Sequence, residues 1–290
     1  MRHIARWDLD KTYLRTEFDT VRQLVRTAFE RPDEKRTNPG AATVMRELAR
    51  AGSMVHILSG SPEQMRSRIE AKLAIDGVRY ESLVLKPNLQ NILRLRFRAV
   101  KDQLGYKLSA LLAARAHEQN KTGPLPVETL FGDDAEVDGF VYSVYGAIVS
   151  RSIDLDVVVA ICQAGEVYAD TRDEILASAQ SILRAPAVER ILIHLESRTP
   201  PGEFQDFGSR LVPSSTTRRP RSFCSRTVAW TAMARFACVR SSPSTTTSTA
   251  MRSPRATPSS CVATPCRGRW ARNSRAPWKL SRFAGRPRSR

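Results

Sequence analysis

The chain has few cysteines and no long hydrophobic run, and these absences exclude several classes of protein. Only Cys162 lies before residue 209, which rules out the disulfide framework of small secreted domains. No apolar stretch approaches the roughly 20 residues that a transmembrane helix requires. The first residues contain no apolar core of a secretory signal. We therefore expect a soluble, cytoplasmic protein without stable membrane insertion.

Acidic residues are absent from residues 209–290, and this absence changes the meaning of the formal net charge of +17. That segment holds 17 Arg and 1 Lys, a charge of +18, so 46 − 18 = 28 basic residues face 29 acidic residues in the rest of the chain. The body at 1–208 therefore has a net charge of −1. Its charge gives no reason to expect nucleic acid as a partner.

The segment 209–290 also lacks Ile, Tyr, Gln and His, and it shows neither strand nor helix periodicity. One interpretation is a disordered basic tail that binds nucleic acid or anionic lipid. The other is out-of-frame translation of a GC-rich gene. Trp230, Trp270 and Trp278, together with four cysteines, favour the second interpretation, because disordered tails seldom contain such residues. We divide the chain into a folded domain, 1–208, and this tail.

Short apolar segments alternate with segments of helical periodicity along the folded domain. The expected strands are 3–8, 53–58, 82–85, 127–131, 156–162 and 190–195. The expected helices are 18–29, 44–52, 61–73, one that begins at 106, and 171–183. This alternation predicts an α/β fold, a Rossmann-like parallel sheet with helices on both faces. Such sheets bind ligands at the carboxyl ends of their strands.

Two carboxylates and a threonine follow the first expected strand, in the motif Asp8-x-Asp10-x-Thr12. Side chains at positions i and i+2 of an extended segment point to the same side, so both acids can face one pocket. One acid could attack phosphorus while the other transfers the proton of the leaving group. The same motif also occurs in ordinary surface turns. Its meaning depends on the rest of the chain.

Three further features follow in order: Ser59-Gly60 after an apolar strand, Lys107 in the expected first turn of a helix, and Asp133-Asp134 with Asp138 after another strand. Each has a structural alternative. Ser59 could cap a helix or close a turn. Lys107 could be solvated, and the aspartates could form a polar loop. Ser61-Pro62 is interpreted as a helix start, with Ser61 as the N-cap.

The order of these four features resembles the haloacid dehalogenase superfamily of phosphohydrolases. Residues 58–62, 85–87, 106–107 and 131–142 look more narrowly like the catalytic domain of the actin-patch type of phosphatidate phosphatase. The resemblance covers residues 3–162. The chain departs from that family's pattern at two positions. It has Tyr106 where the family often has His, and Lys11 where the family often has a second Asp.

The resemblance implies a haloacid-dehalogenase-type sheet with a minimal cap, and a role for each motif residue. Asp8 would be the nucleophile that forms an aspartyl-phosphate, Asp10 the general acid and then base, and Thr12 a brace for the loop. Ser59 with Gly60 would bind the phosphoryl group, and Lys107 would neutralise charge. The implied Mg²⁺ ligands are drawn from Asp8, Asp10, Asp133, Asp134 and Asp138.

We therefore expect a Mg²⁺-dependent phosphohydrolase of phosphomonoesters. A small cap would leave the site open to a bulky substrate, and the resemblance suggests phosphatidate, hydrolysed to diacylglycerol at a membrane surface. A sugar, nucleotide or protein phosphate is the alternative substrate. A basic nucleic-acid-binding protein that acts through its tail is the alternative from another class. The sequence does not indicate an oligomeric state.

Overall fold

The computed structural model describes residues 2–14, 37–86 and 100–214, with only the helical backbone for 100–102. The helix expected at 18–29, any cap that it contributes, and the tail beyond residue 214 lie outside these residues. The described residues form a six-stranded parallel sheet with helices, which confirms the α/β prediction. None of the helices in these ranges combines the length and hydrophobicity of a membrane span.

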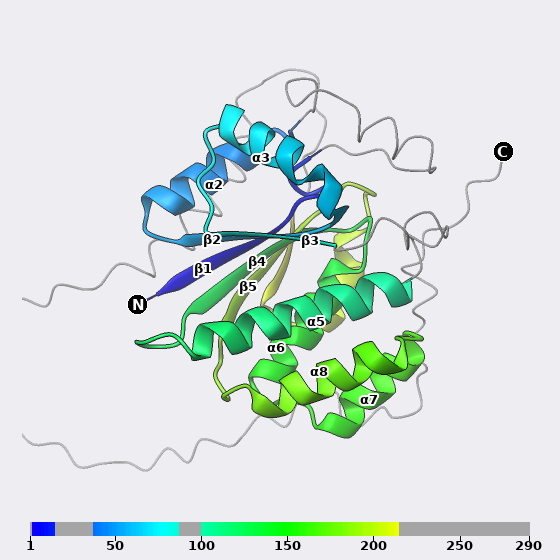
Figure 1. Cartoon of the computed structure of the whole chain (residues 1–290). Coiled ribbons are helices and arrows are strands. Elements are labelled where there is room, and N and C mark those ends of the chain that lie inside the picture. The colour runs from blue at the N-terminus through cyan, green and yellow to red at the C-terminus, as the bar shows by residue number, and fades with distance from the viewer. Residues whose placement is uncertain (1, 15–36, 87–99, 215–290) are drawn as a thin grey trace, which may run out of the picture.

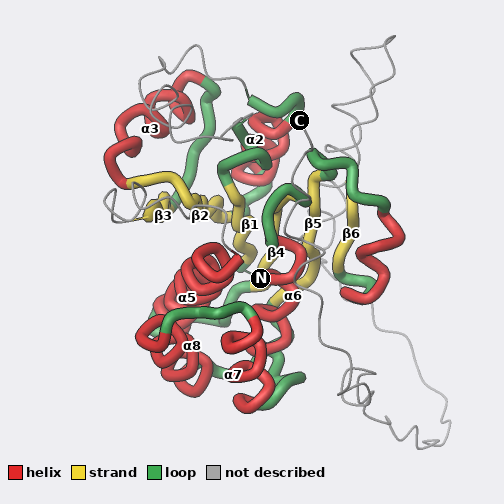
Figure 2. The backbone as a smooth tube through the Cα atoms, turned by 90° about the vertical axis from the view of Figure 1, so that its right-hand side faces the viewer, coloured by secondary structure: helices red, strands yellow, loops and turns green. Residues whose placement is uncertain are grey.

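The strands lie in the order β3-β2-β1-β4-β5-β6 across the sheet (Figure 2). Their bounds are β1 His3–Asp8, β2 Met54–Pro62, β3 Ser82–Lys86, β4 Val127–Asp133, β5 Val188–His194 and β6 Leu211–Ser214. The chain runs outward from β1 in one direction through β3 and in the other through β6. The strand order therefore reverses between β1 and β4, where open α/β sheets form their ligand-binding crevice.

Helices cover both faces of the sheet, with α2 and α3 on one face and α5 to α8 on the other (Figure 1). The helix bounds are α2 Ala41–Arg50, α3 Arg66–Ile75, α5 Val100–Gln119, α6 Asp138–Val149, α7 Leu155–Ala164 and α8 Ala169–Ser181. Two short 3₁₀ helices, η1 Glu63–Met65 and η2 Pro201–Phe207, complete the described elements.

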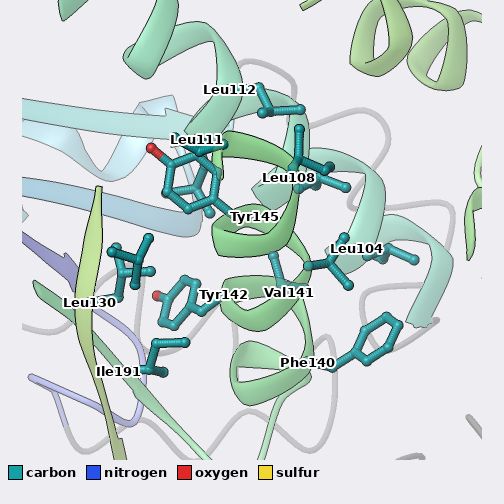
Figure 3. Close-up of a cluster of buried hydrophobic side chains, with 14 of the residues drawn as sticks. Leu104, Leu108, Leu111, Leu112, Leu130, Phe140, Val141, Tyr142, Tyr145 and Ile191 are labelled. Atoms are coloured by element: carbon teal, nitrogen blue, oxygen red, sulfur yellow. The ribbon is translucent and has the colours of Figure 1, made fainter. Parts of the chain in front are cut away.

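The alternation of side chains along β1 creates two separate hydrophobic cores. Trp7 faces α2 and α3, and its ring stacks on Phe131 of β4 with 4.0 Å between ring centroids. On the other face, leucines of α5 pack against Val141 and Tyr145 of α6 and against Leu130 of β4 (Figure 3). Because Asp8 follows Trp7, it faces the α5 side.

The strand expected at 156–162 is wrong, because this segment lies within helix α7. Its run of β-branched residues suggested a strand, but only Val158 and Cys162 are buried, a spacing of four that fits one face of a helix. Helix α6, which carries Asp138 at its first position, was not predicted. Strand β6 extends the sheet to Ser214, six residues beyond the boundary predicted at 208.

The helix start predicted at Ser61 is also wrong. Strand β2 continues to Pro62, and the first helical turn is η1, with Pro62 rather than Ser61 at its N-cap. The register between β2 and β3 shifts between Leu58 and Pro62, so this end of the strand is irregular. The irregularity leaves the hydroxyl of Ser61 available for another partner.

Candidate active site

The carboxyl ends of β1, β2 and β4 bring the motif residues together. Asp8 is the last residue of β1 and pairs in register with Leu58 of β2, so Ser59 comes directly beyond it. Asp133 is the last residue of β4, the neighbour of β1 on the other side. Residues separated by more than 120 positions thus meet where the strand order reverses.

Three buried carboxylates form the centre of the site. Asp8, Asp133 and Asp138 each offer an oxygen atom within 4.8 Å of the others. Asp8 is only 1% exposed, and the other two are fully buried. Hard oxygen ligands at this spacing are what Mg²⁺ prefers, so this set could hold a divalent cation.

Lys107 lies against the carboxylates and is 1% exposed. Its Nζ is 2.9 Å from Asp8 Oδ1 and 2.8 Å from Glu136 Oε2, and it also forms an ion pair with Asp138. The sequence predicted Lys107 in the first turn of a helix. Helix α5 instead begins at Val100, so Lys107 lies two turns into it. One ammonium group thus faces several acids.

The excess of negative charge shifts the pKa values of the cluster. Burial raises the pKa of Asp8 well above its ordinary value, and the charges of Asp138, Glu136 and Asp133 add to this effect, against the opposing charge of Lys107. Burial lowers the pKa of Lys107, but its carboxylate neighbours outweigh burial and raise it overall. The carboxylates therefore repel one another in a dry site, which a bound cation would relieve.

Asp10 lies beside this cluster and is held by two hydroxyl groups. Ser59 Oγ and Ser61 Oγ each donate a hydrogen bond of 2.9 Å to Asp10 Oδ2. The N–H of Ser61 also donates to Ser59 Oγ at 2.9 Å. Burial raises the pKa of Asp10, with a further contribution from Glu136, whereas the two hydroxyls act in the opposite direction. Asp10 is therefore fixed in orientation beside Asp8.

Three buried carboxylate oxygens at the site have no hydrogen-bond partner among the described residues: Asp8 Oδ1, Asp8 Oδ2 and Asp10 Oδ1. Asp8 Oδ1 forms an ion pair with Lys107, so Asp8 Oδ2 and Asp10 Oδ1 are the two that lack both kinds of partner. A buried anionic oxygen without a partner is costly, because it has lost its hydration without replacement. The two unpaired atoms belong to the two acids of the Asp8-x-Asp10 motif.

Of the remaining predicted site residues, Thr12 contacts the carboxylate cluster and Asp134 does not. Thr12 Oγ1 donates to Asp133 Oδ2 at 3.2 Å, which ties the loop after β1 to the end of β4. Asp134 points elsewhere, because its carboxylate accepts backbone N–H groups of Ser197 at 2.6 Å and Thr199 at 2.8 Å. Asp134 therefore lies outside the set of Asp8, Asp133 and Asp138 that could hold a metal ion. It anchors the loop after β5 instead.

The structure also describes the surroundings of Asp10 and Gly60. The carboxylate of Asp10 turns towards the serines rather than joining the set of Asp8, Asp133 and Asp138. Gly60 lies beside Ser59, whose carbonyl accepts a 2.9 Å hydrogen bond from the hydroxyl of Tyr106. A Cβ at Gly60 would meet nothing within 4 Å, so no close approach requires glycine there.

Most of the predicted site side chains are buried, and the small cap from which an open site was expected lies outside the described residues. Asp8, Asp10, Ser59 and Lys107 are all buried, and among the acids nearest Lys107 only Glu136 is noticeably exposed, at 18%. Sequence reasoning also missed Glu136, although its position between Asp133 and Asp138 could have suggested it.

Gly132 is required by the close approach of helix α6 to strand β4. A Cβ at this position would lie 2.5 Å from Asp138 Oδ2, 2.6 Å from Asp138 Cβ and 2.8 Å from a ring carbon of Tyr142. We expect Gly132→Ala to displace Asp138 from Lys107 and to destabilise the protein by about 1–3 kcal/mol, the usual cost of overpacking. Urea unfolding measures the change in free energy.

Gly146→Ala, in helix α6, is the matched control for Gly132→Ala in strand β4. Its Cβ would lie no closer than 3.4 Å to Val188, an ordinary contact. Alanine favours a helix over glycine by about 1 kcal/mol, so this variant should be as stable as the parent or more stable. Equal stability of the two variants would contradict the proposed tight contact at Gly132.

Comparison of the chain with protein-family models, curated proteins and solved structures finds no match.

Proposed function

We propose that the chain is a phosphohydrolase of phosphomonoesters that uses Asp8 as its nucleophile. The observation that carries this proposal is the set of contacts that the Asp8 carboxylate makes at the end of β1. One oxygen of its carboxylate contacts Lys107 at 2.9 Å, and the other is buried without a hydrogen-bond partner among the described residues. Phosphoryl transfer depends mainly on positioning and charge stabilisation, which a fixed carboxylate and a lysine can supply.

In the first step, Asp8 Oδ2 attacks phosphorus and the bond between phosphorus and the ester oxygen breaks. Asp10, held by Ser59 and Ser61, gives its proton to the departing oxygen. The products of this step are the free alcohol and an aspartyl-phosphate at Asp8. Lys107 stabilises negative charge on the phosphoryl group, because its ammonium already touches Asp8.

In the second step, water attacks the phosphorus of the aspartyl-phosphate. Asp10 takes a proton from that water, and the bond between phosphorus and Asp8 breaks. Inorganic phosphate leaves and the carboxylate of Asp8 is restored. The same carboxyl group thus acts first as acid and then as base, which divides one difficult reaction into two easier ones.

The carboxylates fit a divalent cation, and Asp8, Asp133 and Asp138 are the residues that would hold it. The observations that support this fit are the positions of their oxygens, within 4.8 Å of one another, and the mutual repulsion of the buried acids. When bound, Mg²⁺ would neutralise charge on the transferring phosphoryl group. Asp133 and Asp138 are the residues that would keep such an ion beside Asp8.

Metal binding should raise thermal stability, because a ligand that binds only the folded state stabilises it. At about 100 times its dissociation constant, Mg²⁺ would add about 2.7 kcal/mol. We expect thermal unfolding to shift upward with Mg²⁺ in the wild type and in Asp134→Asn, but not in Asp133→Asn. The comparison separates the two neighbouring aspartates. A shift that is lost equally in both variants would contradict the assignment of Asp134 to the loop.

Phosphate release tests the reaction itself. Wild-type protein is incubated with an aryl phosphate and with phosphatidate in micelles, each with Mg²⁺ or with a chelator. We expect Mg²⁺-dependent release, and a preference for phosphatidate would support the substrate that the family resemblance suggests. A preference for the soluble ester would favour a sugar, nucleotide or protein phosphate. Folded protein that releases no phosphate from either would contradict the proposed function.

A further inference from the structure

The loop that carries Asp10 and Thr12 contains a residue in an unfavourable backbone conformation. Lys11 lies between them with φ +60°, in the left-handed region. This conformation brings Cβ close to the backbone and costs a non-glycine residue about 1–2 kcal/mol. Such residues persist only where surrounding contacts hold them. The side chains on either side of Lys11 contact Ser59 and Asp133, so its backbone sets the direction of both.

Asn38 supplies the contacts that hold this loop, from a segment 27 residues further along the chain. Its Nδ2 donates to the carbonyl of Lys11 at 2.5 Å and to the carbonyl of Thr12 at 3.0 Å. Its backbone N–H donates to the carbonyl of Tyr13 at 2.7 Å. Asn38 is 3% exposed, so water does not compete for these bonds. Three consecutive carbonyls of the loop are thus bound by one residue.

We propose that Asn38 is a positioning residue that holds the loop after β1 in the conformation in which Asp10 and Thr12 act. The hydrogen bonds described above join it to the backbone of the loop. It works through the backbone, and the left-handed Lys11 is the residue that it constrains. This inference rests on the proposed phosphohydrolase activity for its kinetic test and on the geometry alone for its structural test.

Asn38→Asp is the sharpest variant, because it keeps the shape of the side chain and replaces two N–H donors with an acceptor that faces two carbonyl oxygens. We expect kcat for an aryl phosphate to fall by about 100-fold, the effect of a small misplacement of catalytic groups, with little change in KM. Thr37→Val is the matched control. Thr37 donates to Asp76 from the same segment and binds neither Lys11 nor Thr12, so its kcat should stay near that of the wild type.

A double-mutant cycle with Lys11→Gly distinguishes positioning from general destabilisation. Glycine adopts φ > 0 without a steric cost, so a loop with Gly at this position depends less on Asn38. Asn38→Asp should therefore reduce kcat about tenfold less in the Lys11→Gly background than in the wild-type background, the factor that corresponds to the relieved strain. If Asn38→Asp reduces kcat by the same factor in the Lys11→Gly background as in the wild type, the proposal is overturned.

Hydrogen exchange gives a test that does not require activity. In the structure, the amide of Thr12 donates to Asp10, and the amides of Tyr13 and Leu14 donate to Leu9. We expect these amides to exchange faster in Asn38→Asp than in Thr37→Val. Unchanged exchange would overturn the role of Asn38 even if the protein is not a phosphatase. If the wild type does not hydrolyse phosphate esters but Asn38→Asp exchanges faster, the proposed function is rejected and the role of Asn38 in holding the loop is retained.

Discussion

Asp8→Asn is expected to abolish phosphate release while leaving a well-folded protein. Asparagine cannot form the aspartyl-phosphate, so kcat should fall by about 10⁴-fold or more. The same change removes a negative charge from a group of buried carboxylates whose oxygens lie within 4.8 Å of one another. Because burial and these neighbours raise the pKa of Asp8, its ionised form opposes folding. The neutral variant should therefore be more stable than the wild type without Mg²⁺.

Phosphate release and urea unfolding measured on the same preparation check both parts of this expectation. Asp134→Asn is the control, because it removes an aspartate charge from the same region but not from the group around Lys107. We expect it to keep kcat within about tenfold of the wild type, since its side chain only anchors a loop. Activity of Asp8→Asn at the level of this control would show that Asp8 is not the nucleophile. A large loss of stability in Asp8→Asn would show that the carboxylates do not repel one another.

The sequence predicted most of the fold because its buried strands are short, apolar and separated by helices. The order of the elements determines which strand ends meet, so the sequence alone predicts that Asp8, Ser59 and Asp133 lie at one edge of the sheet. The prediction of a strand at 156–162 was wrong because β-branched residues also occur in helices, where burial every fourth residue decides. Strand β6 was missed because it lies within residues 209–290, whose composition predicted a tail without strands or helices.

The parts of the site that the sequence did not predict depend on side-chain direction. Nothing in Asp133-Asp134 shows which carboxylate turns inward, since the backbone amides that bind Asp134 belong to Ser197 and Thr199 in a distant loop. Ser61 resembled an N-cap, and only the continuation of β2 turns its hydroxyl to Asp10. Partners that are far apart along the chain leave no local pattern.

Glu128→Ala is expected to destabilise the protein by about 3–5 kcal/mol, the cost of leaving buried charges without their partner. Glu128 is fully buried at the start of β4. Its carboxylate accepts hydrogen bonds from Arg6 at 2.7 Å, Arg115 at 3.1 Å and Tyr145 at 2.9 Å. The alanine variant leaves two guanidinium groups in the interior. Since small domains have about 5–15 kcal/mol of stability, this loss is a large fraction of the total.

The control is Glu70→Ala, which removes a half-exposed carboxylate 3.4 Å from Arg66. Surface pairs contribute about 0–1 kcal/mol, so this variant should unfold close to the wild type in urea. A loss below about 1 kcal/mol in Glu128→Ala would contradict the importance of the buried network.

The pH dependence of the same variant gives a second check on the role of Glu128. Burial alone would raise the pKa of Glu128, but Arg6 and Arg115 outweigh it and lower the pKa below the ordinary value of 4.5. A lowered carboxylate pKa contributes stability that is complete above the unfolded value and is lost as the pH falls through the folded value. The difference in unfolding free energy between wild type and Glu128→Ala should therefore be constant above pH 4.5 and shrink below it. A difference that grows in acid would mean that the folded protein holds Glu128 protonated, and that the two arginines do not stabilise its charge.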